Sequence, residues 1–177
     1  LTSRIGTYNA STKEVFFKDS VVLRNGTYII DTDTLMFQTR TKVANFYSPT
    51  HFLSNKNRMY CELGWYNTQT DQSLFRKNAF ISNGKQSING DSLYYDQKTN
   101  FGLGYKNVVI SDSLKNVQFK GNFAEYRQSG GYSYVTDSAL AIMVEQIDTF
   151  YLHADTLRVL FDTAQNPQRV FAYHHCR

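Results

Sequence analysis

The sequence has few of the residues that break or cross-link a chain. Two prolines and ten glycines in 177 residues argue against a collagen-like or disordered chain. Two cysteines, Cys61 and Cys176, cannot define a disulfide framework, so we expect free thiols, with a single bridge left open. No apolar run approaches about 18 residues, so no transmembrane helix is expected. The chain starts at Leu1 without a signal peptide, and we expect a mature or trimmed segment.

Strongly basic runs are also missing. The formal net charge is +4, and the longest run of cations is the pair Arg76-Lys77. A nucleic-acid-binding surface normally has a denser stripe of Lys and Arg, so no nucleic-acid partner is expected. The mild positive excess fits simple solubility or contact with a phosphorylated, anionic lipid.

Catalytic and metal-binding motifs are absent as well. The sequence contains no Gly-x-Gly-x-x-Gly, P-loop, His-Glu-x-x-His or Gly-x-Ser-x-Gly motif. His174 and His175 next to Cys176 resemble a metal cluster, but adjacent residues on a strand point to opposite faces. A zinc site would need a second ligand pair, for which Cys61 and His153 are only a guess. We therefore expect no metal, no cofactor and no enzymatic activity.

Residues that favour strands are abundant. Thirteen Tyr, thirteen Phe and many Val, Ile and Thr suit a pleated, half-buried surface. Large apolar residues occupy alternate positions at Leu35 and Phe37, and again at Leu93 and Tyr95. This period of two is typical of strands with one buried face, so we predict an all-β fold. Turns are indicated by the pairs Asn25-Gly26, Asn83-Gly84 and Gly130-Gly131.

The chain also repeats itself at an offset of 58 residues. The stretch from Leu1 matches the stretch from Met59 without a gap, and a weaker third copy follows. We predict one domain over 1–177, with repeats at about 1–58, 59–116 and 117–177. Each repeat would bury its apolar face against its neighbours, in an array that continues beyond this segment. Matched positions include Gly6 with Gly64, Phe17 with Phe75, Asn25 with Asn83, Asp33 with Asp91 and Tyr47 with Tyr105.

An aspartate followed by Ser or Thr recurs along the chain. We interpret it as a turn in which the carboxylate accepts backbone amides before the next strand begins. A calcium ladder would need acidic ligands that converge at close intervals, whereas these residues are isolated and unevenly spaced. The aspartates are Asp19, Asp33, Asp91, Asp112, Asp137, Asp148 and Asp155.

Three segments resemble the OstA-like proteins of the Bacteroidetes type, which are relatives of LptA and of the N-terminal domain of LptD. The segments are 89–96, 102–108 and 150–157, and the Gly-x-Tyr-Asn pieces at Gly6 and Gly64 fit the same pattern. The resemblance spans essentially the whole chain, but it is a repeat style and locates no catalytic site. It implies a β-jellyroll, an open, V-shaped stack of antiparallel strands whose subunits join edge to edge. It also implies a periplasmic location, with outer-membrane association left open.

The resemblance further implies that the protein binds lipopolysaccharide and shields the acyl chains of lipid A in an apolar groove. Its expected partners are lipopolysaccharide, other Lpt-type components and further copies of itself joined through edge strands. Each buried methylene contributes about 0.8 kcal/mol, so apolar contacts would set the affinity and Lys and Arg at the rim would orient the headgroup. Arg158 is expected to point outward. From the repeat register, we predict a groove lined by Phe17, Val22, Leu35, Phe37, Phe75, Phe80, Leu93, Tyr95, Leu157 and Val159.

Two other functions fit the same residues. A structural or adhesive β-solenoid with a closed core would bind a protein or glycan on its exterior. A carbohydrate-active enzyme would use an Asp pair that folding brings together. The aromatic residues fit core packing or carbohydrate stacking. The lipid and scaffold hypotheses differ in whether a trough stays open inside the fold.

Overall fold

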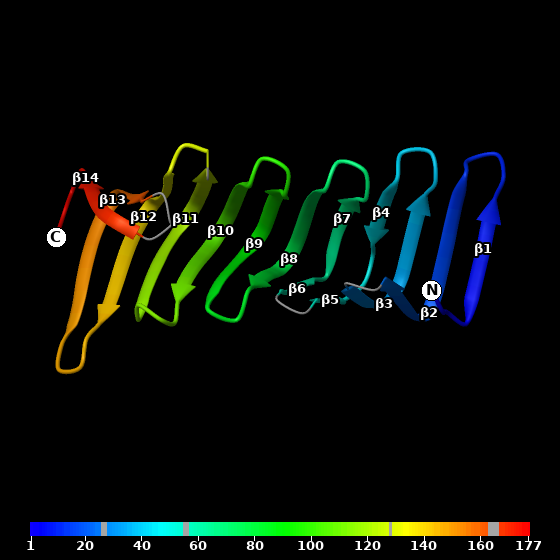
Figure 1. The fold of residues 1–177 in the computed structure, drawn as a ribbon, viewed down its shortest axis with the longest axis horizontal. Helices are drawn as coiled ribbons and strands as arrows, with labels where there is room; N and C mark the ends of the chain where they lie inside the picture. Colours follow the sequence, from blue (N-terminus) through cyan, green and yellow to red (C-terminus); the bar gives the residue numbers. More distant parts are fainter. Residues whose placement is uncertain (26–27, 55–56, 128, 163–166) are drawn as a thin grey trace.

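The structure is a computed structural model that describes residues 1–25, 28–54, 57–127, 129–162 and 167–177. In these ranges all regular elements are strands, and they form one antiparallel sheet (Figure 1). The all-β prediction is therefore confirmed. The strands are β1 (Ile5–Asn9), β2 (Glu14–Asn25), β3 (Tyr28–Gln38), β4 (Val43–Phe46), β5 (Thr50–Ser54), β6 (Arg58–Cys61), β7 (Leu63–Asn67), β8 (Gln72–Ser82), β9 (Gln86–Asp96), β10 (Phe101–Asp112), β11 (Val117–Arg127), β12 (Tyr132–Val144), β13 (Thr149–Phe161) and β14 (Pro167–Tyr173).

The strands follow one another across the sheet in chain order. β3 pairs with both β4 and β5, and β8 pairs with both β6 and β7. Because β4 also pairs with β7, and β5 with β6, β4–β5 and β6–β7 are each one long strand interrupted near its middle. The sheet is thus a ladder of long antiparallel strands, with β1 and β14 at its two ends.

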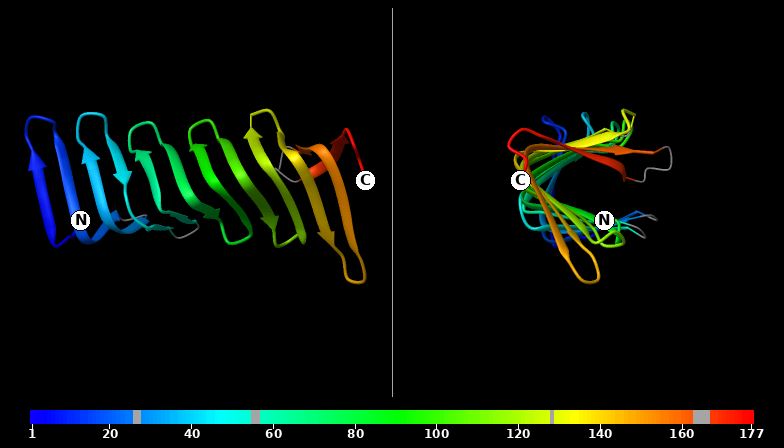
Figure 2. Two further views of the ribbon diagram at one scale, coloured as in Figure 1. Left: turned by 180° about the vertical axis from the view of Figure 1, so that it is seen from behind. Right: turned by 90° about the vertical axis from the view of Figure 1, so that its left-hand side faces the viewer.

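Each long strand bends near its middle, so the sheet folds into two arms. We name them from Figure 1: the upper arm includes β1, β4, β7 and β14, and the lower arm includes β5 and β6. Viewed along the long axis, the molecule has a C-shaped section, with the bends on one side and the opening on the other (Figure 2). The expected open, V-shaped stack is confirmed.

The bends, which we call the corners, come from a repeated irregularity in the ladder. On β2 the register shifts between Lys18 and Val21, and the intervening Asp19 and Ser20 have φ values of 62° and 57°. Two residues there face one residue on β3, which is a β-bulge that bends the strand. The same pairs of left-handed residues recur on β8, β10 and β12, at 77–78, 106–107 and 137–138.

The interpretation of Asp-Ser and Asp-Thr as turns before strands is wrong for most of these aspartates. Asp112 lies at a hairpin turn, where its Oδ1 accepts the amides of Leu114 and Lys115 at 3.0 and 3.1 Å. Asp148 also lies between two strands, β12 and β13. The other five lie inside strands, at the corners: Asp19, Asp33, Asp91, Asp137 and Asp155.

At the corners, carboxylates accept hydrogen bonds from side chains of the next long strand. Asn107 Nδ2 donates to Asp91 Oδ1 at 3.1 Å, and Asn78 Nδ2 donates to Glu62 Oε1 at 2.6 Å. The donors are themselves left-handed residues of the bulges. The polar pairs therefore connect neighbouring strands where the regular ladder is interrupted.

The hairpin turns of the upper arm reveal a unit shorter than the repeat found in the sequence. Asn9, Gln38, Asn67 and Asp96 each accept, through a side-chain oxygen, the backbone amide two residues later. These positions recur every 29 residues, as do the left-handed residues at 13, 42, 71 and 100. The unit of the fold is thus one pair of long strands, half of the 58-residue repeat. The turn at Asn83-Gly84 is confirmed, whereas Gly26 lies outside the described residues.

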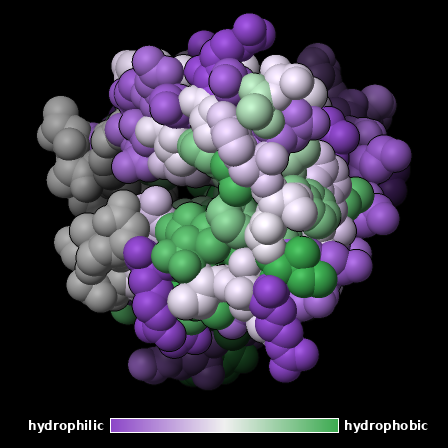
Figure 3. Space-filling model, turned by 90° about the vertical axis from the view of Figure 1, so that its right-hand side faces the viewer, coloured by the Kyte–Doolittle hydropathy of each residue, from purple (hydrophilic) through white to green (hydrophobic). Residues whose placement is uncertain are grey.

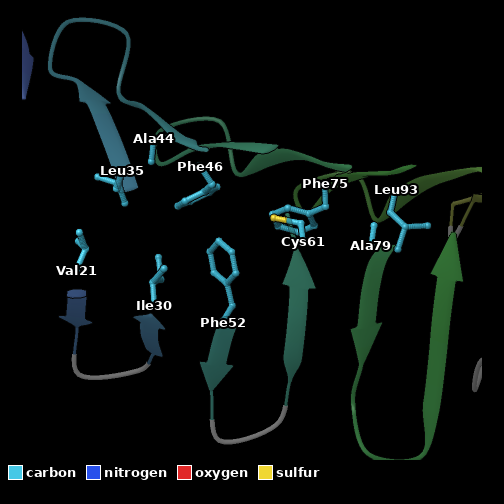
Figure 4. Close-up of a cluster of buried hydrophobic side chains, with 10 residues drawn as sticks. All are labelled: Val21, Ile30, Leu35, Ala44, Phe46, Phe52, Cys61, Phe75, Ala79 and Leu93. Carbon is cyan, nitrogen blue, oxygen red and sulfur yellow. The ribbon is translucent and has the colours of Figure 1, made fainter. Parts of the chain in front are cut away.

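Apolar side chains from both arms meet between them. Phe46 of the upper arm and Phe52 of the lower arm have ring centroids 5.0 Å apart, in edge-to-face contact. Phe52 also lies 5.3 Å from Phe75 of the upper arm. Figure 4 shows these rings among ten buried side chains that point toward one another from the two arms. A second cluster, built on Val108, Ala124, Val135, Ala139, Ala154 and Leu157, continues the core toward the C-terminal end.

Candidate functional site

The face of the sheet that lies between the arms has two zones. Near the corners the side chains are fully buried: Leu35, Phe75 and Leu93 are each 1% exposed and Leu157 is 0% exposed. These residues pack against one another and are the core of the protein, as their contacts show. The accessible part of the inner face therefore lies farther from the corners.

Half-buried apolar side chains line the lower arm farther out, and we call them the inner row. They are not core residues but pack against the two core clusters, and Ile88 contacts both. Because Ile88 joins the clusters, the row crosses the sheet without a polar interruption between them. Figure 3 shows hydrophobic side chains around a hollow at the N-terminal end of the space between the arms. The row consists of Leu23, Tyr28, Met59, Ile81, Ile88, Ile110, Phe119, Ala141 and Leu152.

The upper arm faces the inner row with tyrosine rings whose phenolic hydroxyls are hydrogen-bonded to neighbouring side chains. Tyr66 Oη donates to Asp71 Oδ1 at 2.8 Å, and Tyr95 Oη donates to Asn100 Oδ1 at 2.8 Å. Burial, together with the neighbouring Asp71 carboxylate, raises the pKa of Tyr66. Both phenols therefore stay neutral, and their rings present apolar surface toward the space between the arms.

The register decides which of the ten predicted groove residues face inward. Phe17, Leu35, Phe37, Phe75, Leu93, Tyr95, Leu157 and Val159 lie on the inner face. Arg158 lies on the outer face, as predicted, because its neighbours Leu157 and Val159 are buried. Whether any of these residues contacts a lipid stays a prediction.

The predicted inward orientation is wrong for Val22 and Phe80. Val22 pairs with the exposed Asp31, and its neighbour Val21 is fully buried. Phe80 pairs with the exposed Asn89, next to the buried Ala79. Val22 follows the inward Phe17 by five residues, and Phe80 follows the inward Phe75 by five. An odd separation along a strand places two side chains on opposite faces. The two-residue bulges at 19–20 and 77–78 do not change this alternation.

On the strands that pair with the bulged strands, two residues that are five positions apart can face the same side. Ile30 and Leu35 of β3 are also five residues apart, yet both lie in the core. There a single residue faces the two-residue bulge of β2, so the alternation slips by one position. Sequence alternation alone missed this slip and therefore the inner row of the lower arm. In the sequence, the alternating apolar residues at 79 and 81, and at 108 and 110, are the feature that indicates this inward row.

The cysteines and histidines do not form a candidate metal centre. Within the described ranges no group of three or more His, Cys, Asp and Glu side chains could hold an ion. Cys61 and Cys176 are both free thiols in the structure. Cys61 is fully buried in the core, and burial raises the pKa of its thiol to about 12. His175 Nδ1 lies 2.9 Å from Asp155 Oδ2 at the last corner.

Two further concave surfaces lie away from the inner face. One is at the turn between β12 and β13, lined by Lys115, Asn116 and residues 144–148. The other is on the outer face of the upper arm, lined by Tyr132, Tyr134, Thr156, Arg158 and Tyr173. Among the described residues, no helix has the length and apolarity required to cross a membrane.

Comparison with known proteins agrees with this architecture. Residues 29–91, from β3 to β9, match the family of OstA-like proteins. No curated protein matches the chain by sequence. The crystal structure of LptH from Pseudomonas aeruginosa, the LptA-homologous periplasmic component of a lipopolysaccharide transport device, is similar in fold. It has a TM-score of 0.53 and 11% identity, and the match covers 59% of this chain and 79% of that one. The first match confirms the resemblance to OstA-like proteins over residues 29–91, and the second confirms a fold similar to that of an LptA homologue.

Proposed function

We propose that this chain is a periplasmic protein that binds and transports lipopolysaccharide, holding the acyl chains of lipid A along the inner row. The main support for this proposal is the inner row, a strip of half-buried apolar side chains on the open side of the core. Neighbouring strands lie about 4.8 Å apart, so a row that crosses ten strands extends over roughly 40 Å. That length exceeds one extended acyl chain, which suits movement along the sheet.

The energetics favour the inner row over the buried core as the lipid contact. Each methylene removed from water contributes about 0.8 kcal/mol, so an acyl chain gains affinity from many similar contacts. Binding at Leu93 or Phe75 would instead require displacing side chains that are already packed. Graded apolar contacts without a deep pocket also permit release, which transport requires.

Charged groups lie where a headgroup would meet the edges of the arms. Lys85 and Lys115 are exposed at turns of the lower arm, and Lys42 and Lys98 are exposed at turns of the upper arm. An exposed ion pair contributes about 0–1 kcal/mol. We therefore assign these lysines to orienting the phosphorylated end of the lipid, while the apolar row supplies most of the affinity.

Adjacent residues of β10 provide a sharp test. Ile110 belongs to the inner row, whereas Val109 pairs with Asn89 and Lys120 on the outer face. A photo-crosslinking residue at position 110 should capture lipopolysaccharide, and the same residue at 109 should not. Ile81 and Phe80 on β8 provide a second inner and outer pair.

Three outcomes separate the hypotheses. Capture at positions 110 and 81 alone supports the lipid function. Equal capture on both faces contradicts it. No capture by a variant that remains folded favours the structural or adhesive scaffold, since the interior would then be closed to lipid.

The ends of the sheet suit assembly with other copies or with Lpt-type components. In the part of the chain that the structure describes, β1 pairs with β2 and β14 with β13, each on one side. An edge strand offers backbone groups for strand addition. The N–H of Tyr8 points to the free edge, because Tyr8 alternates with the residues of β1 that bond to β2. A Tyr8→Pro variant in β1 should therefore weaken self-association in analytical ultracentrifugation, while Tyr8→Ala should not. A wild-type chain that stays monomeric at high concentration would contradict this part of the proposal.

A further inference from the structure

The outer face of the upper arm carries a concave site near the C-terminal end of the sheet. Its lining comes from three neighbouring strands: β12, β13 and β14. The residues lie on the side opposite the core, because Ser133, Val135, Leu157 and Val159, which alternate with them, are buried. We call the site the outer slot, and its residues are Tyr132, Tyr134, Thr156, Arg158 and Tyr173.

The walls of the outer slot are aromatic. On β12, the rings of Tyr132 and Tyr134 are nearly parallel, with centroids 6.5 Å apart and an angle of 17°. On β14, Phe171 and Tyr173 repeat this arrangement at 6.5 Å and 22°. β13 lies between these strands, so the two aromatic pairs stand about 10 Å apart across it. Thr156 and Arg158 project from β13 between the two aromatic pairs, so a ligand would lie over these two side chains with the aromatic rings on either side.

The floor of the slot is polar. Thr156 and Thr136 have hydroxyl oxygens 2.7 Å apart, and Thr136 Oγ1 donates to the carbonyl of Asp155 at 3.1 Å. Because the Thr136 proton is used there, Thr156 donates to Thr136 and keeps lone pairs free to accept. The phenolic groups of Tyr132 and Tyr173 add further hydroxyls around the slot.

One cation faces the slot. The Arg158 guanidinium carbon lies 4.7 Å from the centre of the Tyr132 ring, which orients its fork of N–H donors. The nearby Glu125 carboxylate is already compensated, since it accepts hydrogen bonds from Arg127 and from Tyr134 Oη. The charge that the slot presents to a ligand is therefore positive.

We propose that the outer slot binds a saccharide that carries a carboxylate or a phosphate. The C–H groups on the face of a pyranose pack against aromatic rings, and its hydroxyls match Thr156 and the phenols. The anionic group would pair with Arg158 through charge-assisted hydrogen bonds. An acyl chain fits poorly, because it would bury the guanidinium and hydroxyls without partners. This site lies on the opposite face from the inner row and does not depend on it.

Calorimetry with a trimer of galacturonic acid, and with its carboxyl-reduced neutral counterpart, tests the proposal. The acidic trimer should bind more tightly than the neutral one. Arg158→Gln should weaken the acidic trimer about tenfold, the usual size for a lost hydrogen bond to a charged group, and leave the neutral trimer unchanged. Tyr173→Ala should weaken both trimers. Arg76→Gln is the matched control, because Arg76 is an exposed cation on β8, far from the slot in the strand order.

Several results would overturn the proposal. They are failure of both trimers to bind at millimolar concentration, equal weakening by Arg158→Gln and Arg76→Gln, and displacement of the trimer by laurate. Circular dichroism of each variant excludes misfolding as the cause. Lipopolysaccharide itself distinguishes two sources of the sugar. If Arg158→Gln weakens the binding of lipopolysaccharide while crosslinking at position 110 is intact, the ligand is the lipid-linked saccharide. If the substitution weakens only the binding of the trimer, the ligand is a free glycan.

Discussion

The two halves of the sheet fill the same corner with different side chains. From β2 to β9 the buried residues include the rings of Phe46, Phe52 and Phe75, whereas from β10 to β13 the buried cluster consists of Val, Ala and Leu side chains. The section nevertheless remains C-shaped along the whole array (Figure 2). The backbone geometry of the corner is therefore set by the bulges and not by the volume of the side chains inside it.

Close backbone approach explains how the second half stays filled. A Cβ at Gly121 would lie 2.5 Å from Val135 Cγ1 and 2.7 Å from the carbonyl oxygen of Thr136. One at Gly104 would lie 3.1 Å from a methyl group of Val108. Small residues thus let neighbouring strands approach closely, and this close approach fills the space that aromatic rings fill in the first half. Some aromatic rings of the second half, among them Phe123 and Tyr134, lie on the outer face.

Truncation of a core ring should separate the two halves most clearly. Phe75→Ala removes a ring that is 1% exposed, and the free energy of unfolding should fall by about 3–5 kcal/mol. Val135→Ala, in the second cluster, removes two carbon atoms and should cost about 2 kcal/mol. Urea denaturation measures both. Equal losses would show that the halves are equally dependent on their corner residues.

Overpacking tests the close approach of strands at single glycines. Gly121→Ala forces its methyl group against Val135 and the backbone, and we expect a loss of about 1–3 kcal/mol. Gly6→Ala is the control, because a Cβ there would lie 3.6 Å from the Phe17 ring, an ordinary contact. Thermal unfolding of the two variants measures the difference. A stable Gly121→Ala protein would mean that the corner can widen.

Acid should affect the turns of the later units more than those of the earlier ones. Asn67 and Asn83 close turns as neutral amides, and Asp96 and Asp112 take these roles 29 residues later. A hydrogen bond from Gln72 and backbone amides lowers the pKa of Asp96 below 3.8. For Asp112, burial alone would raise the pKa, but hydrogen bonds from Gln86 and backbone amides lower it.

A lowered pKa in the folded state stabilises the protein above the unfolded value and loses that effect as the pH falls through the folded value. The unfolding midpoint should therefore fall as the pH is lowered below about 4. The double variant Asp96→Asn and Asp112→Asn should show a smaller fall, measured by thermal scans across that range. An identical fall would show that other carboxylates carry the acid sensitivity.

Much of the fold could be predicted from the sequence, because each strand buries one face and the repeat is visible. The 29-residue unit could not, since successive units alternate small and large residues at one inner position. Gly6, Leu35, Gly64 and Leu93 occupy that position in turn. A Cβ at Gly64 would lie 2.5 Å from the carbonyl oxygen of Leu74, so a leucine cannot occupy that site. Only every second unit therefore matches in sequence.

The candidate site was harder to predict than the fold. Periodicity distinguishes two faces of a strand, but it does not distinguish buried core from accessible lining on the same face. Leu93 and Ile88 both point inward from β9, yet only Leu93 is fully buried. That difference depends on distance from a corner, and the corners arise from left-handed Lys106 and Asn107, residue types with no strong sequence signature for a bulge.

The corner geometry allows the length of the array to change only in fixed steps. Insertion or deletion of 29 residues adds or removes two strands, so the array changes length by about 10 Å while every remaining hairpin keeps its orientation. An odd number of strands would instead leave the final edge running in the opposite direction. Lengths that preserve the polarity of both ends therefore come in discrete steps, and natural variants of this architecture should differ by whole strand pairs.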